Sequence, residues 1–458
     1  MRTIPCLLLL ELLVVDTAVA QPSGADLAAR LNEVAESAFS EYSLAGLSIA
    51  VMVGNDIEFA NGYGFEDIDQ GVEATPETIY MIGSVSKQFA AVGILQLVEE
   101  GAVGLDDPIT TYLPDFEDSA PPILIRHLLR HTSGISDDLS PDLRDLQTGI
   151  EPAEYPLRAA VPLIARQRRL YAPGDWWSYS NVNYALLAAL IERVTGMSYE
   201  DFLAVSFFRP HGLSSTRVCG QRWAEDRPRA VRYNVDNGVL SEADALWVPD
   251  KANGICTSVL DLAQWMRALV DGGLVSEESY ERIISVEPVA AGFTPPYGFG
   301  LSMTPLAGEP AVWHTGVGSG VFSLLAYFPN HDVIIAMAAN TGGRPLELAA
   351  TGATLARATM RLANVSLRDL DAGGSEIERI LGTYNDYLFE IRVSNESGQP
   401  QVQIPRMGVT EPLLYQGGNE FSTPKPTGLR FRFEPAGERA QLVIFDWMEI
   451  RSYGRRSD

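Results

Sequence analysis

Residues 314–340 have the sequence HTGVGSGVFSLLAYFPNHDVIIAMAAN. Two apolar runs, Val321–Phe328 and Val333–Ala339, flank the turn residues Pro329 and Asn330. Runs of this length that are rich in β-branched and aromatic residues and separated by turn residues predict a β-hairpin. We therefore expect two antiparallel strands late in the chain, directly after three closely spaced glycines.

A second hairpin is predicted near the beginning of the chain. Leu47–Val53 and Ile57–Tyr63 are apolar runs on either side of Gly54-Asn55-Asp56, which is typical turn sequence. The region between the two hairpins has helical character. Strand signals at both ends of a helical middle predict one sheet assembled from the two ends, in an α/β domain.

Helices are predicted where apolar residues recur every three or four positions. Ser84–Glu100 shows this pattern and is followed by Gly101, a typical residue after a helix C-terminus. Three further segments have helical spacing: Ile123–Arg130, Val182–Val194 and Leu260–Val270.

The last part of the chain differs in character. After Asp369, which opens a linker-like stretch through Gly374, the sequence contains a short helical piece and then short strands broken by Gly, Pro and Asn. This pattern predicts a small β-rich domain over residues 369–458, after a main domain over residues 21–368 and a leader over residues 1–20. Its predicted strands include Phe389–Val393, Leu429–Phe433 and Gln441–Phe445.

The charge of the chain limits its partners. The formal net charge is -25, and no basic patch is visible, which excludes nucleic acid as a partner because phosphate binding needs clustered basic residues. Almost all basic residues are arginine, and lysine occurs only at Lys87, Lys251 and Lys425. Since a desolvated ammonium can lose its proton and a guanidinium cannot, Lys87 is a candidate for proton transfer.

The N-terminus predicts export. Arg2 precedes an apolar stretch, Ile4–Val15, and Ala18-Val19-Ala20 fits a signal-peptidase site before Gln21. The run is too short and too polar to span a bilayer. We expect a cleaved signal and a periplasmic or secreted protein without a membrane-spanning segment; an uncleaved anchor or a disordered leader is the alternative.

Cysteine usage leaves one question open. Cys6 lies in the predicted leader, so the mature chain would keep Cys219 and Cys256. In an oxidising compartment these two can pair, but two separate buried thiols fit the spacing equally well.

Ser84-Val85-Ser86-Lys87 places a hydroxyl and an amine three residues apart at the start of a predicted helix. Side chains at i and i+3 share a helix face, so the lysine can reach the serine. Helix N–H groups near Ser84 also favour developing negative charge. The pattern is common by chance and needs support from elsewhere in the chain.

Two further motifs supply that support. Tyr179-Ser180-Asn181 lies just before a predicted helix and offers a phenol for proton transfer and an amide for substrate binding. His314-Thr315-Gly316 precedes the late hairpin, and its glycine lets a ligand approach a strand edge closely.

In this order, the three motifs resemble the serine β-lactamase and penicillin-binding-protein-like hydrolases, marked by Ser-x-x-Lys, Tyr-x-Asn and Lys/His-x-Gly. The stretches Ile125–Gly134, Gly254–Trp265 and His314–Asn340 resemble that family too, so the likeness covers Leu47–Leu362. It implies a β-lactamase/transpeptidase-like fold, in which an antiparallel sheet flanked by helices joins a helical subdomain and the site lies in the cleft between them. Here a small C-terminal β-domain is added, as in related branches.

The resemblance also implies roles for single residues. Ser84 would be the nucleophile, Lys87 and Tyr179 would share general acid and base work, and Asn181 would orient the substrate. The backbone N–H groups of Ser84 and Val317 would form the oxyanion hole, beside His314 and Gly316. The implied enzyme is a serine hydrolase related to class C β-lactamases.

The histidine at position 314 narrows the substrate. Members that hydrolyse or bind penicillins usually carry lysine there to hold the substrate carboxylate, and neutral imidazole attracts an anion less. We therefore expect small-molecule esters or D-amino-acid peptides as substrates. A β-lactamase or D,D-carboxypeptidase and a non-catalytic binding protein on the same fold are the alternatives.

No cofactor or metal is expected. His127 and His131 are four residues apart, but no acidic residue between them completes a His-Glu-x-x-His zinc motif, and packing roles are expected for both. The oligomeric state does not follow from the sequence.

Overall fold

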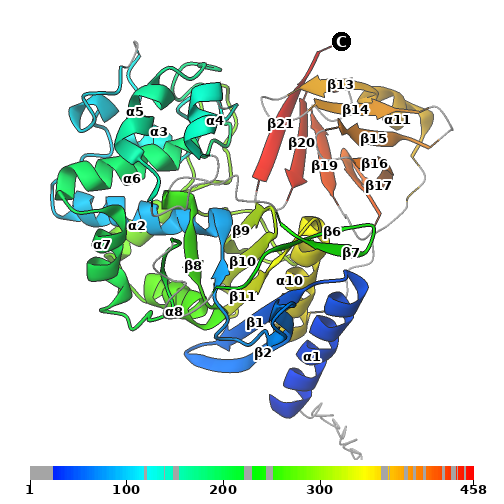
Figure 1. Cartoon of the computed structure of the whole chain (residues 1–458). Helices are drawn as coiled ribbons and strands as arrows, with labels where there is room; N and C mark the ends of the chain where they lie inside the picture. The colour runs from blue at the N-terminus through cyan, green and yellow to red at the C-terminus, as the bar shows by residue number, and fades with distance from the viewer. Residues whose placement is uncertain are drawn as a thin grey trace, which may run out of the picture.

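The computed structural model describes residues 24–117, 121–138, 140–147, 154–220, 229–243, 251–362, 370, 372–385, 390–395, 399–405, 409–424, 429–434, 440, 442–447 and 450–457. The predicted leader with Cys6 lies outside these residues, as do Asp369 and Phe389. Figure 1 shows a helical lobe, a central sheet and a separate C-terminal sheet.

The central sheet has the strand order β3-β2-β1-β11-β10-β9. Strand β1 pairs antiparallel with β11 from Leu47 opposite Ala339 to Val53 opposite Val333, so strands from the two ends of the domain are neighbours. Both predicted hairpins and their union in one sheet are confirmed. The strands are β1 (Gly46–Val53), β2 (Asp56–Asp67), β3 (Val72–Glu73), β9 (Val312–Gly318), β10 (Val321–Phe328) and β11 (Val333–Ala339).

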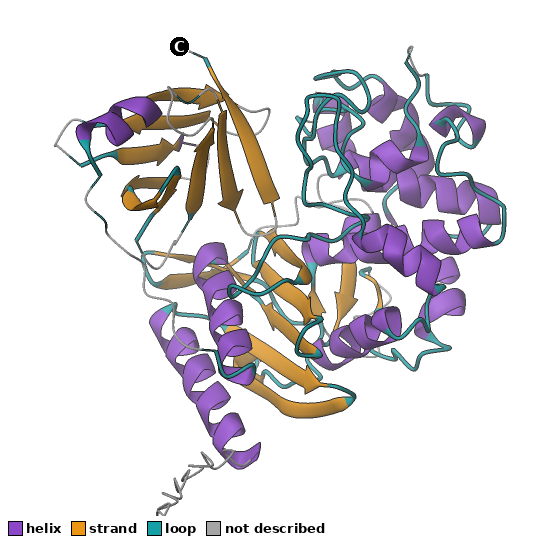
Figure 2. Cartoon of the chain, turned by 180° about the vertical axis from the view of Figure 1, so that it is seen from behind, coloured by secondary structure: helices purple, strands orange, loops and turns teal. Residues whose placement is uncertain are grey.

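Helices cover both faces of this sheet. Successive side chains of a strand point to opposite faces, and in β1 the side chains of Ile49 and Val51 join one core while Ala50 and Met52 join the other. Helices α1 (Gly24–Glu41) and α10 (Pro345–Thr359) cover the first face, as Figure 2 shows from behind, and α8 (Val259–Val270) packs on the second. Because both faces are buried, the central strands are continuously apolar rather than alternating.

The helical lobe is built around α6 (Val182–Thr195), which is buried from Val182 to Ile191 and ends at Gly196 with φ of 70°. The predicted segments at Ile123–Arg130, Val182–Val194 and Leu260–Val270 are helical within a few residues. The lobe and its connections contain α2 (Lys87–Glu99), α3 (Ile125–Leu129), α4 (Pro141–Gln147), α5 (Leu157–Ala165), α7 (Tyr199–Leu203), a π-helical turn (Ala204–Phe208), α9 (Glu277–Ile284) and the 3₁₀ turns η1 (Gly83–Ser86), η2 (Ile109–Thr111) and η6 (Lys251–Asn253).

A three-stranded sheet joins the lobe to the central sheet. Its order is β4-β8-β5, and a disulfide links Cys219, directly after β5, to Cys256 in β8 with a Cα–Cα distance of 5.2 Å. The pairing left open by the sequence is therefore formed. These strands are β4 (Tyr80–Met81), β8 (Ile255–Thr257) and β5 (Arg217–Val218); β12 (Thr341–Gly342), β6 (Tyr233–Asp236) and β7 (Val239–Glu242) make another small sheet.

The C-terminal sheet has nine antiparallel strands in the order β16-β15-β14-β13-β21-β20-β19-β18-β17. The last strand pairs with the first one, β13, so the ladder continues through the middle of the sheet. Its own core includes Tyr384, Phe421 and Phe433. The elements are α11 (Gly374–Ile380), β13 (Gly382–Asn385), β14 (Glu390–Ser394), β15 (Gln401–Ile404), β16 (Val409–Pro412), β17 (Leu414–Gly417), β18 (Glu420–Ser422), β19 (Arg430–Glu434), β20 (Leu442–Trp447) and β21 (Ile450–Arg456).

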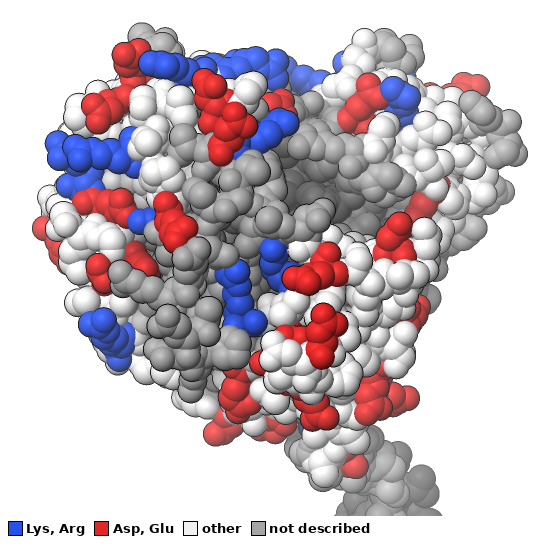
Figure 3. Space-filling view, in the orientation of Figure 1, with Lys and Arg blue, Asp and Glu red and all other residues white. Residues whose placement is uncertain are grey.

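The surface reflects the negative net charge. Figure 3 shows acidic side chains in the majority over the lower part of this face, around α1 and the β1–β2 hairpin. No helix in the described part of the chain combines the length and apolar character that crossing a bilayer requires.

Removal of the disulfide should destabilise the main domain. We expect the double variant Cys219→Ser/Cys256→Ser to lose about 2–4 kcal/mol of unfolding free energy, because the cross-link restricts the unfolded chain. Urea denaturation followed by tryptophan fluorescence measures the loss. Wild type treated with reductant should behave like the variant, and equal midpoints for oxidised wild type and variant would contradict the prediction.

Candidate active site

Ser84 lies in the 3₁₀ turn η1, one turn before α2, rather than in the α-helix that the sequence predicted from Ser84 onward. Gly83 has φ of +51°, which a glycine adopts without strain. In a 3₁₀ turn the side chains at i and i+3 eclipse one another, which aligns Ser84 with Lys87. Lys87 Nζ lies 3.0 Å from Ser84 Oγ.

The segment before Ser84 is fixed by two sheets. The Ile82 N–H donates to the Ile255 carbonyl in β8 (3.0 Å), and the Ile82 carbonyl accepts from Ser323 Oγ in β10 (2.7 Å). Gly316 in β9 permits this contact, because a β-carbon there would lie 1.9 Å from the Ile82 carbonyl oxygen. The glycine of the His-x-Gly motif therefore lets the nucleophile turn lie directly against the edge strand.

The oxyanion-hole candidate Val317 follows on the same strand. A β-carbon on Gly83 would be 3.3 Å from the Val317 nitrogen, so that backbone N–H lies beside the turn that carries Ser84. The Val317 side chain is 40 % exposed and stands where β9 forms the edge of the sheet. The structure thus brings Ser84 and Val317 to the same edge.

The amine of Lys87 is surrounded by hydrogen-bond acceptors. The side chain is fully buried, and Nζ donates to Asn181 Oδ1 at 2.8 Å and also to Asn253 Oδ1. The same nitrogen lies 4.8 Å from the centre of the Tyr179 ring. Asn253, in η6, was not among the residues predicted from the sequence, because nothing in its neighbours marks it as functional.

These contacts restrict what the amine can do. An amide oxygen only accepts, so Asn181 and Asn253 occupy two N–H bonds of Lys87. The third position faces Ser84 Oγ. In the ammonium form that position is a third N–H, and in the neutral amine it is the lone pair, which can accept the Ser84 proton.

Asp137 fixes the orientation of Asn181. Its carboxylate accepts the Asn181 backbone N–H at 2.6 Å and the side-chain Nδ2 at 2.9 Å, which leaves Oδ1 directed at Lys87. Burial raises the pKa of Asp137, and the two hydrogen bonds from Asn181 oppose that rise. Asp137 was also missed by the sequence analysis, since it lies 44 residues from its partner.

His131 supports the loop that carries Tyr179. Its Nδ1 accepts from the Ser180 N–H and from Asn183 Nδ2, both at 3.2 Å, and its ring centroid is 4.3 Å from that of Tyr179. Burial, together with the charges of Lys87 and His314, holds the pKa of His131 well below its usual range.

His127 has a different environment from His131. Its Nδ1 accepts from the Leu124 N–H at 3.2 Å, and burial lowers its pKa to about 4. Within the described residues, no three His, Cys, Asp or Glu side chains gather where they could hold a metal ion.

His314 is buried and engaged on both ring nitrogens. Nδ1 lies 2.6 Å from the Thr315 carbonyl, which only accepts, so Nδ1 carries the proton and Nε2 accepts from the Tyr297 hydroxyl at 2.9 Å. Burial, and then the charge of Lys87, lower the pKa of His314 to about 3. The imidazole is therefore neutral at physiological pH and presents no positive charge to a ligand.

Aromatic side chains form a wall beside Lys87. Trp177, Tyr179 and Tyr297 belong to one buried cluster, against which Phe293 packs. Trp176 meets Phe293 edge to face at 4.7 Å, and the loops are joined by hydrogen bonds from Ala290 and Ala291 to the carbonyls of residues 174 and 175. This wall supplies apolar surface next to the polar centre.

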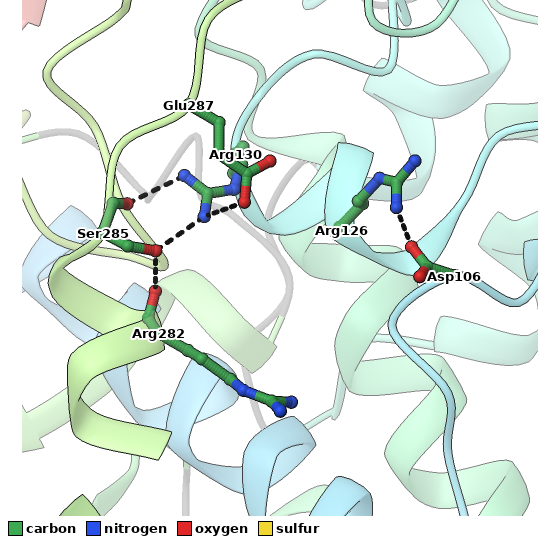
Figure 4. Close-up of polar contacts among 6 residues, drawn as sticks. All are labelled: Asp106, Arg126, Arg130, Arg282, Ser285 and Glu287. Carbon is green, nitrogen blue, oxygen red and sulfur yellow. Dashed lines mark hydrogen bonds and ion pairs between the residues drawn. The ribbon is translucent and has the colours of Figure 1, made fainter. Parts of the chain in front are cut away.

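Arg130, at the end of α3, anchors the loop that leads to Phe293. Its guanidinium donates to the Ser285 carbonyl (2.8 Å) and hydroxyl (2.9 Å) and to Glu287 Oε1 (3.0 Å), as Figure 4 shows. In the same view Arg126 pairs with Asp106, on the other side of α3. A buried arginine with three acceptors fixes the loop in one position.

The C-terminal sheet reaches the same wall. The guanidinium of Arg455 in β21 lies 4.1 Å over the Trp176 ring, a cation–π contact between the two parts of the chain. The C-terminal sheet is thereby attached to the loop that continues into Tyr179.

Comparison with known proteins places the chain by sequence. The family model described as Beta-lactamase matches residues 25–359. Penicillin-binding protein 4* of Bacillus subtilis (strain 168) is 30% identical over 297 residues, which cover 61% of this chain and 64% of that protein. A D-aminopeptidase of Brucella canis is 30% identical over 283 residues, 61% of this chain and 53% of the relative. The chain thus spans between about half and two thirds of these curated relatives' length.

Solved structures share the fold. The octameric penicillin-binding protein homologue from Pyrococcus abyssi superposes with a TM-score of 0.65 at 23% identity and covers 93% of this chain and 99% of its own. The D-amino acid amidase from Ochrobactrum anthropi SV3, complexed with L-phenylalanine amide, has a TM-score of 0.62 at 22% identity, with 73% and 98% covered.

Burial of neutral His314 should make the fold acid-sensitive. The folded pKa of about 3 lies below the unfolded value, so the unfolded state binds the proton first and stability is lost as pH falls from about 6.5 towards 3. We expect His314→Gln to reduce the slope of unfolding free energy between pH 6 and 4 by about 1.4 kcal/mol per pH unit, one proton's worth.

Urea titrations at several pH values measure this slope. His211→Gln, which removes a half-buried histidine outside the site, is the matched control and should keep the wild-type slope. A His314→Gln slope equal to that of wild type would show that His314 titrates alike in the folded and unfolded states.

Proposed function

The chain belongs to the beta-lactamase family of serine hydrolases, and on that premise we propose that it is an exported hydrolase that forms an acyl-enzyme on Ser84. Its substrates would be esters or peptides and amides that carry a D-amino acid. The observation that carries the proposal is the Lys87 amine, held 3.0 Å from Ser84 Oγ by two amide oxygens.

The proposed reaction follows from these contacts. Lys87 Nζ takes the proton of Ser84 as Oγ bonds to the substrate carbonyl carbon, and the tetrahedral intermediate expels an alcohol or amine that receives a proton through Lys87 and Tyr179. Water then attacks the acyl carbon, releases the acid and returns a proton to Ser84. The negative oxygen would be stabilised by the N–H groups of Ser84 and Val317, which come to one strand edge.

Neutral His314 supports the choice of substrate. A site for a substrate carboxylate needs a cation, and the imidazole at this position accepts a proton only near pH 3. The aromatic wall around Trp177 and Tyr297 suits an apolar acyl group or side chain. The 30% identity to D-aminopeptidases also favours D-amino-acid substrates.

Export is supported by the disulfide between Cys219 and Cys256, because such bonds persist in oxidising compartments. Together with the predicted leader, it favours a periplasmic or secreted protein. The proposed reaction needs no cofactor.

A fluorophosphonate probe tests the nucleophile. The probe should label wild type at Ser84, as identified by mass spectrometry of the labelled peptide, and should not label Ser84→Ala. Lys87→Ala should lower hydrolysis of p-nitrophenyl esters by at least about 100-fold, since general-base catalysis is lost. Labelling at another residue, or ester hydrolysis that survives Lys87→Ala, would refute the proposal and leave a binding protein on the same fold.

A substrate panel tests the acyl group. With short p-nitrophenyl esters, D-amino-acid p-nitroanilides and nitrocefin, we expect kcat/KM for nitrocefin to be at least about 100-fold lower than for the best ester, because the carboxylate finds no cation at position 314. Nitrocefin turnover comparable with ester turnover would favour a β-lactamase instead.

Arg455 should influence large substrates. Arg455→Ala removes the contact on Trp176, so we expect kcat/KM for D-peptides to change by about 5- to 20-fold, the value of one cation–π contact, with little effect on p-nitrophenyl acetate. Arg392→Ala, in the same sheet, is the control. Equal effects on small and large substrates would show that Arg455 only stabilises the protein.

A further inference from the structure

Beyond the serine, lysine and tyrosine of the three motifs, a buried asparagine from a separate segment contacts the reacting amine. We propose that Asn253 is a positioning residue that keeps the lone pair of neutral Lys87 aimed at Ser84, and that its lack of charge is what the reaction requires. The inference rests on the proposed function, since it assigns a task within the Ser84 reaction.

The first argument is the rigidity of Asn253. Its side chain is 2 % exposed, and it ends the 3₁₀ turn η6. Lys251 of the same turn makes an ion pair with Glu192 of α6 at 3.0 Å, with both side chains largely buried. Two residues after Asn253, Ile255 enters β8 and receives the hydrogen bond from Ile82. The turn is therefore held on both sides, against α6 and beneath the nucleophile segment.

The second argument is the geometry of the amine. A tetrahedral nitrogen with two of its hydrogens bound to Asn181 and Asn253 has one remaining direction towards Ser84. Without Asn253 the amine can rotate and direct an N–H at Ser84 Oγ, which then meets a donor instead of a base. Two acceptors are the smallest number that excludes this rotation.

The third argument concerns charge. A carboxylate beside Lys87 would stabilise the ammonium and remove the base, whereas amide oxygens accept the same hydrogen bonds without a negative charge. The other groups that face Lys87 are Tyr179 and Tyr184 by their rings, and His131 and His314 at longer range. Burial raises the pKa of Tyr184 and lowers that of both histidines, so all are neutral near pH 7.

Asp137 is the one carboxylate in these surroundings. It is separated from the amine by the Asn181 amide, whose N–H groups it accepts. The geometry thus places neutral acceptors next to Lys87 and the negative charge one residue farther away.

The test compares Asn253→Asp with Asn253→Leu in the full-length protein. In Asn253→Asp the added carboxylate should hold the ammonium, so the acidic limb of the kcat/KM profile for a p-nitrophenyl ester should move up by at least about one pH unit. At pH 7 the rate should fall about 100-fold and recover partly at pH 9 to 10. Asn253→Leu should lose about 10- to 100-fold in kcat at every pH, with KM little changed, because one acceptor is missing.

Asn55→Asp, the same change in the exposed β1–β2 turn, is the matched control and should keep the wild-type profile. Thermal melting and fluorophosphonate labelling of each variant separate a folding defect from a chemical one. If Asn253→Asp fails to fold, Asn253→Leu decides.

The inference is overturned if Asn253→Asp keeps the wild-type acidic limb, or if folded Asn253→Leu retains kcat within about twofold. Failure of the proposed function has a different signature: wild type itself would not be labelled at Ser84, or Ser84→Ala would keep full activity.

Discussion

The structure depends on how one buried amine is satisfied. Lys87 is fully buried, and an ammonium or amine in that position is tolerated only if its N–H groups find acceptors. The acceptors come from three parts of the chain: Ser84 from the turn before α2, Asn181 from the start of α6, and Asn253 from η6. The helical lobe and the nucleophile turn are thus tied together at a single nitrogen, and any shift between them would leave buried polar groups unpaired.

The sheets keep these parts in place. Strands β4 and β8 carry the chain to Ser84 and away from Asn253, and the disulfide at Cys256 fixes β8 from its other side. The central sheet contributes Gly316, whose missing β-carbon allows the Ile82 carbonyl to lie against β9. The packing that stabilises the domain therefore also sets the distance between Ser84 and its base, so core changes far from the site should be visible in the chemistry.

Local signals in the sequence predicted the parts of this arrangement that are local in the chain. Both hairpins, helix α6 and the Ser84–Lys87 pair follow from periodicity and short spacing, and the family resemblance brought Tyr179, Asn181 and His314 together. Asn253 and Asp137 were not predictable in this way, because each acts on a partner 44 or more residues away and has no neighbouring motif. The 3₁₀ turn at Ser84 was missed because its cause is tertiary, a glycine at positive φ pressed against β9.

Neutrality is the common property of the groups around Lys87. Two amides supply its acceptors, two buried histidines have pKa values lowered by desolvation, and the nearest carboxylate acts through an intervening amide. A lysine at position 314 would add a positive charge that attracts an anionic substrate but also repels a proton arriving at Lys87. With histidine held neutral between Tyr297 and the Thr315 carbonyl, the electrostatic attraction for a carboxylate is lost, and selection of the substrate falls to the aromatic wall. Since that wall is attached to the C-terminal sheet through Arg455 and Trp176, the shape of the accepted substrate depends on a part of the chain outside the region that the family model matches.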